Sequence, residues 1–378
     1  MKIIINSSTF KGTGVTQVAV SFIHECINFR ENDYIVFMSP NVAANVKQNE
    51  FPDNFKFYIF GNNSLYGFKG KYDLKKMKHI ESIYKPDAVF SVFGPSLWKP
   101  KAPHIQGYAY AHYIYTDSPY FKRLGFMERF MVAVRRFVHM GHMKREGKYF
   151  VCETEDVSRR LHEMYNIDLN NIFTVSNTAN SSFLNYKPKG NDIGVDSVFK
   201  LYSLCSNAPN KNLGILNTVI PVLKSLHLHK KVVFYLTIPQ EDYARMFNDE
   251  VKDSIINVGP LKVAECASFV DSCDALFLPT LLECFSASYP EAMLLKKPIL
   301  TSNLPFATTV CEDAAIYFDP LDSIDIANKI VQLVESPQLI KDLQRKGELR
   351  LKSFLSPKDR AKKYLEICKI VSKDGQNI

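Results

Sequence analysis

The stretch ALFLPTLLECFSASYPEAMLLKKPILTS, residues 275–302, determines the fold class, because it combines a strand, a loop, a helix and a second strand. The apolar run at 275–280 has the length of a buried strand, and KPILTS at 297–302 repeats that pattern after a helical segment. Two strands joined by a helix form the basic unit of a parallel sheet. The stretch therefore predicts an α/β fold.

The same alternation of strands and helices extends in both directions from this stretch. A polar segment at 184–197 interrupts it, and its Gly, Pro, Asn, Asp and Lys residues are typical of a linker. We therefore predict two Rossmann-like domains, 1–184 and 185–355, with a C-terminal helix at 356–378 that packs back on the first. The other predicted strands are 2–6, 34–38, 87–93, 104–110, 148–152, 172–176, 199–205, 231–238, 254–259 and 314–318.

Composition narrows the classes of function. The 378 residues are 46% hydrophobic and 23% charged, which is typical of a globular protein, and no window of 18 uncharged apolar residues occurs. We expect a cytoplasmic protein. The eight cysteines form no CxxC pair, so neither a zinc site nor a disulfide framework is expected. The net charge of +8 favours a polyanionic partner, but no nucleic-acid-binding module accompanies it.

The loop after the strand at 275–280 carries the main candidate site. Glu283 lies in this loop, Glu291 lies in the first turn of the next helix, and the amides around Ser286 and Ser288 suit an anion such as a diphosphate. A second interpretation is structural, because Ser288 and Glu291 have the spacing of a helix capping box. Glu283 has no structural role that the sequence indicates.

This segment resembles the signature of the family 4 glycosyltransferases, which have the GT-B fold. Glu283 and Glu291 have the family's seven-residue separation, and EAM and a KP strand follow them. The resemblance implies that Glu283 contacts the transferred sugar and Glu291 the ribose of the nucleotide. It also places the donor against the loop between them, which consists of Cys284, Phe285, Ser286 and Ala287. In this loop Cys284 and Ser286 stand where the family usually has glycines.

A second segment, NAPNKNLGIL at 207–216, follows the first strand of the second domain. Lys211 in it resembles the family's phosphate-binding lysine, although a lysine before a helix is more commonly a solvent-facing residue. The arginine that the family often has a few residues earlier is missing, and Cys205 and Ser206 stand there. We also expect Gly259, at the end of the strand at 254–259, to contribute to donor binding.

The first domain supplies further candidates. Gly12, Thr13 and Gly14 lie between its first strand and first helix, where small residues allow a phosphate or substrate to approach closely, although a plain tight turn would also explain them. No third glycine or following acidic residue indicates an NAD site. His112 follows the strand at 104–110, and the resemblance implies a place beside the donor sugar, with a structural role as the alternative. Asp117 is a second candidate there.

Residues 121–148 predict a basic amphipathic helix, with eight Lys or Arg residues against two glutamates. One interpretation is a surface that binds anionic lipid head groups. The other is a helix packed on the core with a solvated cationic face. The apolar side comprises Met127, Phe130, Met131, Val134 and Val138, opposite Lys122, Arg129 and Arg136.

With these features, the resemblance implies a retaining glycosyltransferase of the hexosyltransferase type. It would transfer a sugar from a nucleotide-sugar donor to a glycan or lipid-linked acceptor in cell-surface polysaccharide or lipopolysaccharide synthesis. We expect it to act in the cytoplasm, at the inner face of the membrane. No DxD motif occurs, so neither a metal nor another cofactor is required. The alternatives are a non-catalytic nucleotide-sugar-binding partner, an epimerase and a phosphorylase.

Overall fold

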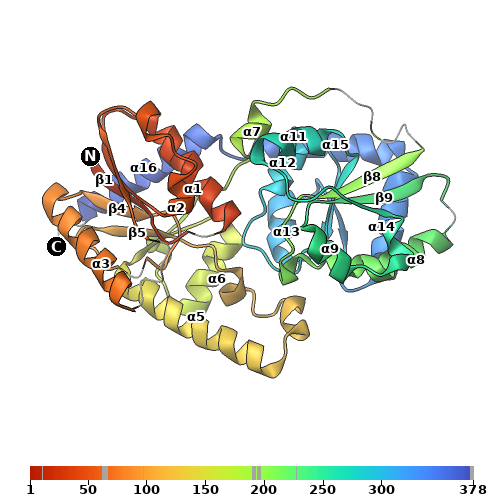
Figure 1. Ribbon diagram of the computed structural model, residues 1–378, viewed down its shortest axis with the longest axis horizontal. Helices are drawn as coiled ribbons and strands as arrows, with labels where there is room; N and C mark the ends of the chain where they lie inside the picture. The colour runs from red at the N-terminus through yellow and green to blue at the C-terminus, as the bar shows by residue number, and fades with distance from the viewer. Residues whose placement is uncertain are drawn as a thin grey trace. The chain divides into compact units, whose positions relative to one another are not determined.

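The computed structural model describes residues 1–374 except 11, 62–66, 97, 190–192, 194–196 and 227. The chain forms two compact units, and each is described by itself (Figure 1). Unit 1 comprises Met1–Ile114, Phe126–Asn177 and Leu355–Ile378, and unit 2 comprises Tyr115–Gly125 and Thr178–Phe354. The predicted domain limits were residues 184 and 355. The structure therefore assigns 115–125 and 178–184 to the second unit.

Unit 1 is built on a seven-stranded parallel sheet with the order β3-β2-β1-β4-β5-β6-β7. Ile3 in β1 lies opposite Tyr34 in β2 and Ala88 in β4. These central strands are almost continuous apolar runs, as expected when helices cover both faces of a sheet. The strands are β1 (Lys2–Ser7), β2 (Asp33–Met38), β3 (Phe55–Ile59), β4 (Ala88–Ser91), β5 (His104–Gly107), β6 (Tyr149–Cys152) and β7 (Ile172–Thr174).

The last helix of the chain belongs to the core of unit 1. The Tyr364 ring lies edge-on to Phe22, with centroids 5.1 Å apart, and 4.9 Å from the Phe90 ring. Arg360 is buried and donates hydrogen bonds to Asn177 and Ser21. The helices of the unit are α1 (Thr13–Glu25), α2 (Pro40–Ala43), α3 (Gly67–Tyr84), α4 (Ala111–Ile114), α5 (Phe126–Glu146), α6 (Glu155–Tyr165) and α16 (Pro357–Asp374).

Unit 2 contains a six-stranded parallel sheet with the order β10-β9-β8-β11-β12-β13. Its strands are β8 (Val198–Ser203), β9 (Lys231–Leu236), β10 (Ile255–Asn257), β11 (Ala275–Leu278), β12 (Ile299–Ser302) and β13 (Ile316–Phe318). Its helices are α7 (Ser181–Leu184), α8 (Leu216–Ser225), α9 (Gln240–Met246), α10 (Asp249–Lys252), α11 (Val263–Asp271), α12 (Ser288–Leu294), α13 (Pro305–Cys311), α14 (Ser323–Val334) and α15 (Pro337–Leu351).

Both sheets confirm the predicted fold class of two Rossmann-like domains. All predicted strands are present, but β3 was missed, because Lys56 interrupts its apolar pattern and the strand lies at the sheet edge with its side chains only partly buried. In each sheet the strand order reverses between two neighbours, β1 and β4 or β8 and β11. Ligands of open α/β sheets bind beyond the carboxyl ends of such strands. Among the described residues, no helix is long and apolar enough to span a bilayer.

Candidate functional site

The reversal point in unit 2 brings together two loops that are far apart in the sequence. The loop after β8 and the loop after β11 start from adjacent strand ends. The Leu281 amide donates to the Asn210 carbonyl at 2.7 Å, and the Asn210 side-chain amide donates to the Leu282 carbonyl at 2.8 Å. These reciprocal hydrogen bonds align the two loops, so the residues that follow them, Lys211 and Glu283, lie side by side.

Lys211 and Glu283 form an ion pair in which the lysine Nζ donates to the carboxylate Oε1. Their side chains are only 15% and 17% exposed, so water screens this pair less than a surface pair. Burial alone lowers the pKa of Lys211, but the Glu283 carboxylate outweighs burial, and the pKa lies above its ordinary value. Lys211 is therefore positively charged at neutral pH.

Cys205 lies beside this pair, at a position where the sequence suggested that an arginine was missing. Burial raises the pKa of its thiol to about 11, an effect that Lys211 opposes and Glu283 reinforces. The Cys205 amide donates to the Thr237 hydroxyl at 3.2 Å. The thiol is therefore neutral, and it does not supply the charge that an arginine would have brought.

Glu291 is a buried carboxylate on α12. It is 8% exposed, and its Oε1 accepts a hydrogen bond of 3.3 Å from the Asn180 amide. Burial raises the pKa of Glu291 to about 7, although the Asn180 amide acts in the opposite direction. The capping-box interpretation is wrong, because Ala287 is the N-cap of α12 and no side-chain cap bond is found at this end of the helix. Glu291 therefore has no capping role.

The loop that joins Glu283 to α12 is held by its own side chains. Cys284, Phe285 and Ser286 are buried, and the Phe285 ring packs edge-on against Phe354 with centroids 6.0 Å apart. Ala287 is half-buried at the start of the helix. Since α12 has only seven residues, its dipole is short, and the charge for binding an anion has to come mainly from side chains.

Arg123 is a candidate that the sequence analysis missed. Its guanidinium group donates to the Asn212 side-chain oxygen, and Asn212 directly follows Lys211. Ser118 fixes the same segment by donating to the Leu281 carbonyl at 2.6 Å. Arg123 and Asn212 are 89 positions apart, and no motif spacing connects them. The pairing therefore depends on the fold, which places 115–125 within unit 2.

The remaining sequence candidates lie in other loops of unit 2 or in unit 1. Gly259 has a left-handed φ of 77° in the loop after β10, and β9 separates β10 from β8. Gly12 caps α1 in unit 1, where Thr16 donates to its carbonyl, and a Cβ on Gly14 would meet no described heavy atom within 4 Å. The side chain of Thr13 lies outside the described residues. His112 is half-buried in α4 of unit 1, and Asp117 is exposed in unit 2.

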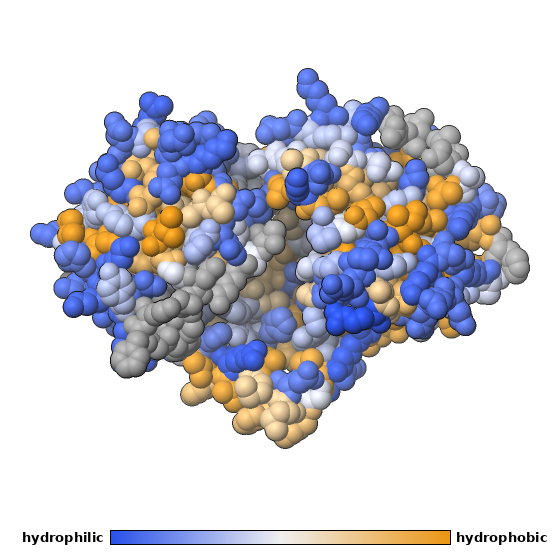
Figure 2. Space-filling view, viewed as in Figure 1, coloured by the Kyte–Doolittle hydropathy of each residue, from blue (hydrophilic) through white to orange (hydrophobic). Residues whose placement is uncertain are grey.

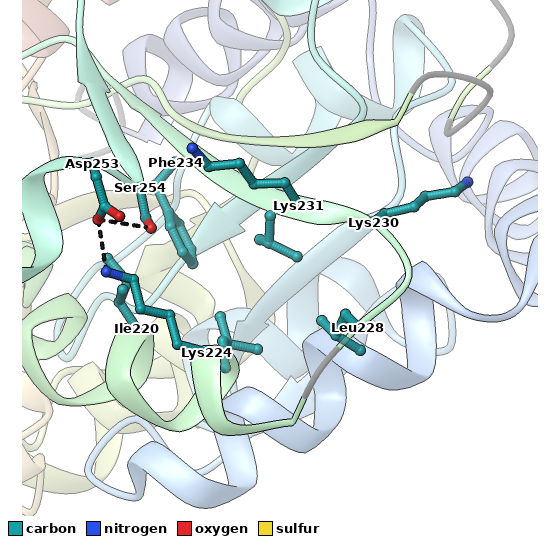
Figure 3. Close-up of a pocket in the computed structure, with 10 residues that line it drawn as sticks. Ile220, Lys224, Leu228, Lys230, Lys231, Phe234, Asp253 and Ser254 are labelled. Carbon is teal, nitrogen blue, oxygen red and sulfur yellow. Dashed lines mark hydrogen bonds and ion pairs between the residues drawn. The ribbon is translucent and has the colours of Figure 1, made fainter.

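A cavity of about 300 Å³ in unit 2 lies away from the candidate site (Figure 3). It is formed at the amino ends of β9 and β10, whereas the site lies beyond the carboxyl ends of β8 and β11. Lys224 lines this cavity and donates to the Asp253 carboxylate at 2.8 Å and the Glu250 carbonyl at 2.7 Å. The cavity, which Lys230 and Lys231 also line, is thus a separate part of unit 2 from the candidate site.

The chemistry of the candidate site is that of a polar, charged ligand. Lys211 and Arg123 provide positive charge and directional N–H donors, which suit phosphate oxygens. Glu283 and Glu291 can accept hydrogen bonds from hydroxyl groups when they are ionised. Within the described parts of the chain, no three His, Cys, Asp or Glu side chains gather where they could hold a metal ion. The arrangement therefore fits a phosphorylated, hydroxyl-rich molecule.

Comparison with known proteins relates this chain to glycosyltransferases in part of its sequence and in its fold. Residues 200–336 match the family described as glycosyl transferases group 1, and these residues include Lys211, Glu283 and Glu291. No curated protein matches the chain. Solved glycosyltransferase structures resemble it over nearly the whole length and confirm the GT-B fold.

Three of these structures illustrate the likeness. WaaG, a glycosyltransferase involved in lipopolysaccharide biosynthesis, has a TM-score of 0.71 and 11% identity, covering 97% of this chain and 99% of WaaG. Anabaena HepE in complex with UDP and glucose has a TM-score of 0.68 and 15% identity, covering 98% and 99%. A Rickettsia africae glycosyltransferase has a TM-score of 0.69 and 14% identity, covering 98% of each chain.

Proposed function

We propose that this protein is a glycosyltransferase that takes its sugar from a nucleoside diphosphate donor bound by unit 2. The observation that carries the proposal is the buried Lys211–Glu283 ion pair at the reversal point of the unit 2 sheet. It lies within the segment that matches glycosyl transferases group 1. HepE, which has the same fold, was solved with UDP-glucose. We therefore propose UDP-hexoses as the first donors to test.

In the proposed complex the diphosphate takes the place of Glu283 as the partner of Lys211. A diphosphate carries more negative charge than one carboxylate, so it competes well for the lysine, and Arg123 adds a second cation. Glu283 is then released to accept hydrogen bonds from the sugar hydroxyls. Glu291 accepts hydrogen bonds from the ribose. The ion pair of the free protein thus keeps both groups in position for the donor.

We propose that transfer retains the configuration at the anomeric carbon. The bond from this carbon to the diphosphate oxygen breaks, the acceptor oxygen bonds to the same face, and the acceptor proton passes to the departing phosphate. Lys211 and Arg123 stabilise the charge that develops on the leaving group, and Glu283 positions the sugar. No metal or other cofactor is part of the proposal. His112 is proposed to lie beside the sugar, as the family resemblance implies.

The proposed acceptor is a glycan or a lipid-linked sugar in the synthesis of a cell-surface polysaccharide. This part of the proposal is supported by the fold shared with WaaG, a glycosyltransferase involved in lipopolysaccharide biosynthesis. TarM, with a TM-score of 0.65, was solved with UDP and α-GlcNAc-glycerol. We propose that the reaction takes place in the cytoplasm, where nucleotide-sugars are made available to such enzymes.

The proposal is tested by incubating the protein with a panel of UDP-, GDP- and ADP-sugars and measuring nucleoside diphosphate release. We expect slow hydrolysis of one donor, which Lys211→Ala abolishes. An epimerase would change the sugar without net release of the diphosphate, and a non-catalytic partner would bind a donor without turnover. Either result, or the absence of binding to every donor, would refute the proposed activity.

A further inference from the structure

Helix α5 exposes its apolar side chains instead of burying them. Phe126 is 85% exposed, Phe137 83% and Met127 67%, and four further apolar residues of the same helix are at least 40% exposed: Phe130, Met131, Val134 and Val138. An amphipathic helix of a globular domain normally turns such residues toward the core. In Figure 2 hydrophobic residues gather at the surface where Figure 1 places α5.

The exposed residues form one face, and the helix is attached to unit 1 by another. At 3.6 residues per turn, the seven apolar side chains fall within an arc of about 140°. The buried Met143 lies roughly opposite, and the buried Met140 lies beyond the edge of the arc at Phe126. On that side the Gln106 amide donates to the Met143 carbonyl at 2.8 Å, and Tyr113 shares a hydrogen bond of 2.8 Å with His139. The interpretation of the apolar side as core-packed is therefore wrong.

Positive charge borders this apolar face. Arg129, Arg135 and Lys144 are exposed, and Arg135 lies next to Met131 around the helix. Of the two glutamates in α5, Glu128 is exposed and Glu146 is buried. The border of α5 thus carries an excess of cations around an apolar centre.

We propose that this face of α5 docks on an anionic lipid bilayer. Phe126, Phe130 and Phe137 enter the boundary between head groups and acyl chains, and the bordering cations contact lipid phosphates. A bilayer satisfies both halves of the surface, whereas a second copy of the chain would bring two cationic borders together. Arg136 is not part of the docking surface, because it is half-buried and faces Tyr165 of unit 1.

Co-sedimentation with vesicles tests this proposal. The vesicles contain phosphatidylcholine and phosphatidylglycerol at about 3:1, with pure phosphatidylcholine as reference. We expect the wild type to bind the anionic vesicles at low salt and to lose binding as salt increases. Replacing Phe126, Phe130 and Phe137 with serine should lower the partition coefficient at least tenfold without lowering the melting temperature, because these rings are exposed.

Two matched variants sharpen the experiment. Replacing Ile324, Leu349 and Ile370 with serine removes three apolar side chains that are 61%, 52% and 51% exposed on other helices, and binding should not change. Replacing Arg129, Arg135 and Lys144 with glutamine should weaken binding by about fivefold per residue. The measurement does not involve sugar transfer, so the Glu283→Ala variant should bind vesicles normally even though it is inactive.

Three outcomes would overturn the proposal. The first is a wild type that does not bind anionic vesicles at low salt. The second is a triple serine variant of the phenylalanines that binds them as the wild type does. The third is a dimer, seen by light scattering, that depends on these phenylalanines while vesicles leave its mass unchanged, because α5 would then be covered by a second copy.

Discussion

The two charged regions of this molecule differ in what surrounds their cationic side chains. At the candidate donor site in unit 2, Lys211 is paired with Glu283, Arg123 with Asn212, and both loops are fixed by hydrogen bonds. On α5 of unit 1, cations border an apolar face that remains exposed. The first arrangement is prepared for a small ligand that replaces an internal partner. The second suits an extended surface, because its apolar and cationic groups are spread along a helix.

The largest effect is expected from Glu283→Ala. We expect transfer to fall by about 10²-fold or more, because the sugar loses the group that positions it. Nucleoside diphosphate affinity should stay equal or increase, since Lys211 loses its internal competitor. Turnover and calorimetric titration of the same preparation measure both quantities. Glu335→Gln, which changes an exposed glutamate of the same unit, serves as the control. Full activity of Glu283→Ala would remove this residue from the site.

Lys211→Ala should weaken nucleoside diphosphate binding by about 1.5–3 kcal/mol, the usual contribution of a charge-assisted hydrogen bond. Binding of the nucleoside alone should hardly change. The matched control is Lys224→Ala, because Lys224 is also ion-paired in unit 2 but lines the cavity of Figure 3. Calorimetry with both ligands decides the matter. Equal losses for diphosphate and nucleoside would mean that Lys211 does not contact phosphate.

Glu291 should make both donor binding and stability depend on pH. Its pKa of about 7 means that the carboxylate becomes a full acceptor for ribose hydroxyls only as pH rises through 7, so affinity should rise there. The stability of the folded protein should change with pH in the opposite direction. The raised pKa of the folded state favours the protonated form, so the wild type loses stability relative to Glu291→Gln between about pH 4.5 and 7.

Melting temperatures and donor titrations of both proteins across this range measure the two effects. Glu291→Gln should bind the donor more weakly at pH 8 and with little dependence on pH. Parallel pH profiles of wild type and variant would show that another group is responsible.

The smallest effects concern Arg123 and Arg135, two exposed arginines that are assigned to different regions. Arg123→Gln should weaken diphosphate binding several-fold, because the Arg123 guanidinium group is hydrogen-bonded to Asn212, the residue that follows Lys211. It should leave vesicle binding unchanged. Arg135→Gln should do the reverse, with about a fivefold loss of vesicle binding. If both variants changed the same property, the two regions would not be separate.

Much of the fold could be predicted from the sequence, because buried parallel strands are short apolar runs, and in this chain such runs alternate with helical patterns. Glu283 was found for a related reason, since a carboxylate directly after such a strand falls at the ligand-binding edge of the sheet. The edge strand β3 was missed, because its side chains alternate only weakly between buried and exposed.

The rest could not be predicted, because it depends on contacts between distant parts of the chain. Lys211 and Glu283 are 72 positions apart, and neither residue signals the other. Arg123 reaches Asn212 only because its segment packs on unit 2. For α5, periodicity defined an apolar side but not its surroundings. The buried Met140 and the exposed Met131 have the same chemistry, and only the position of the rest of unit 1 distinguishes them.

The most direct test of the central claim is a crystal structure of the protein with the nucleoside diphosphate that it binds best. The account predicts the terminal phosphate within about 3 Å of the Lys211 Nζ, a broken or shared Lys211–Glu283 pair, and ribose hydroxyls at the Glu291 carboxylate. A diphosphate bound elsewhere, with the ion pair intact and Glu291 still bonded only to the Asn180 amide, would contradict it.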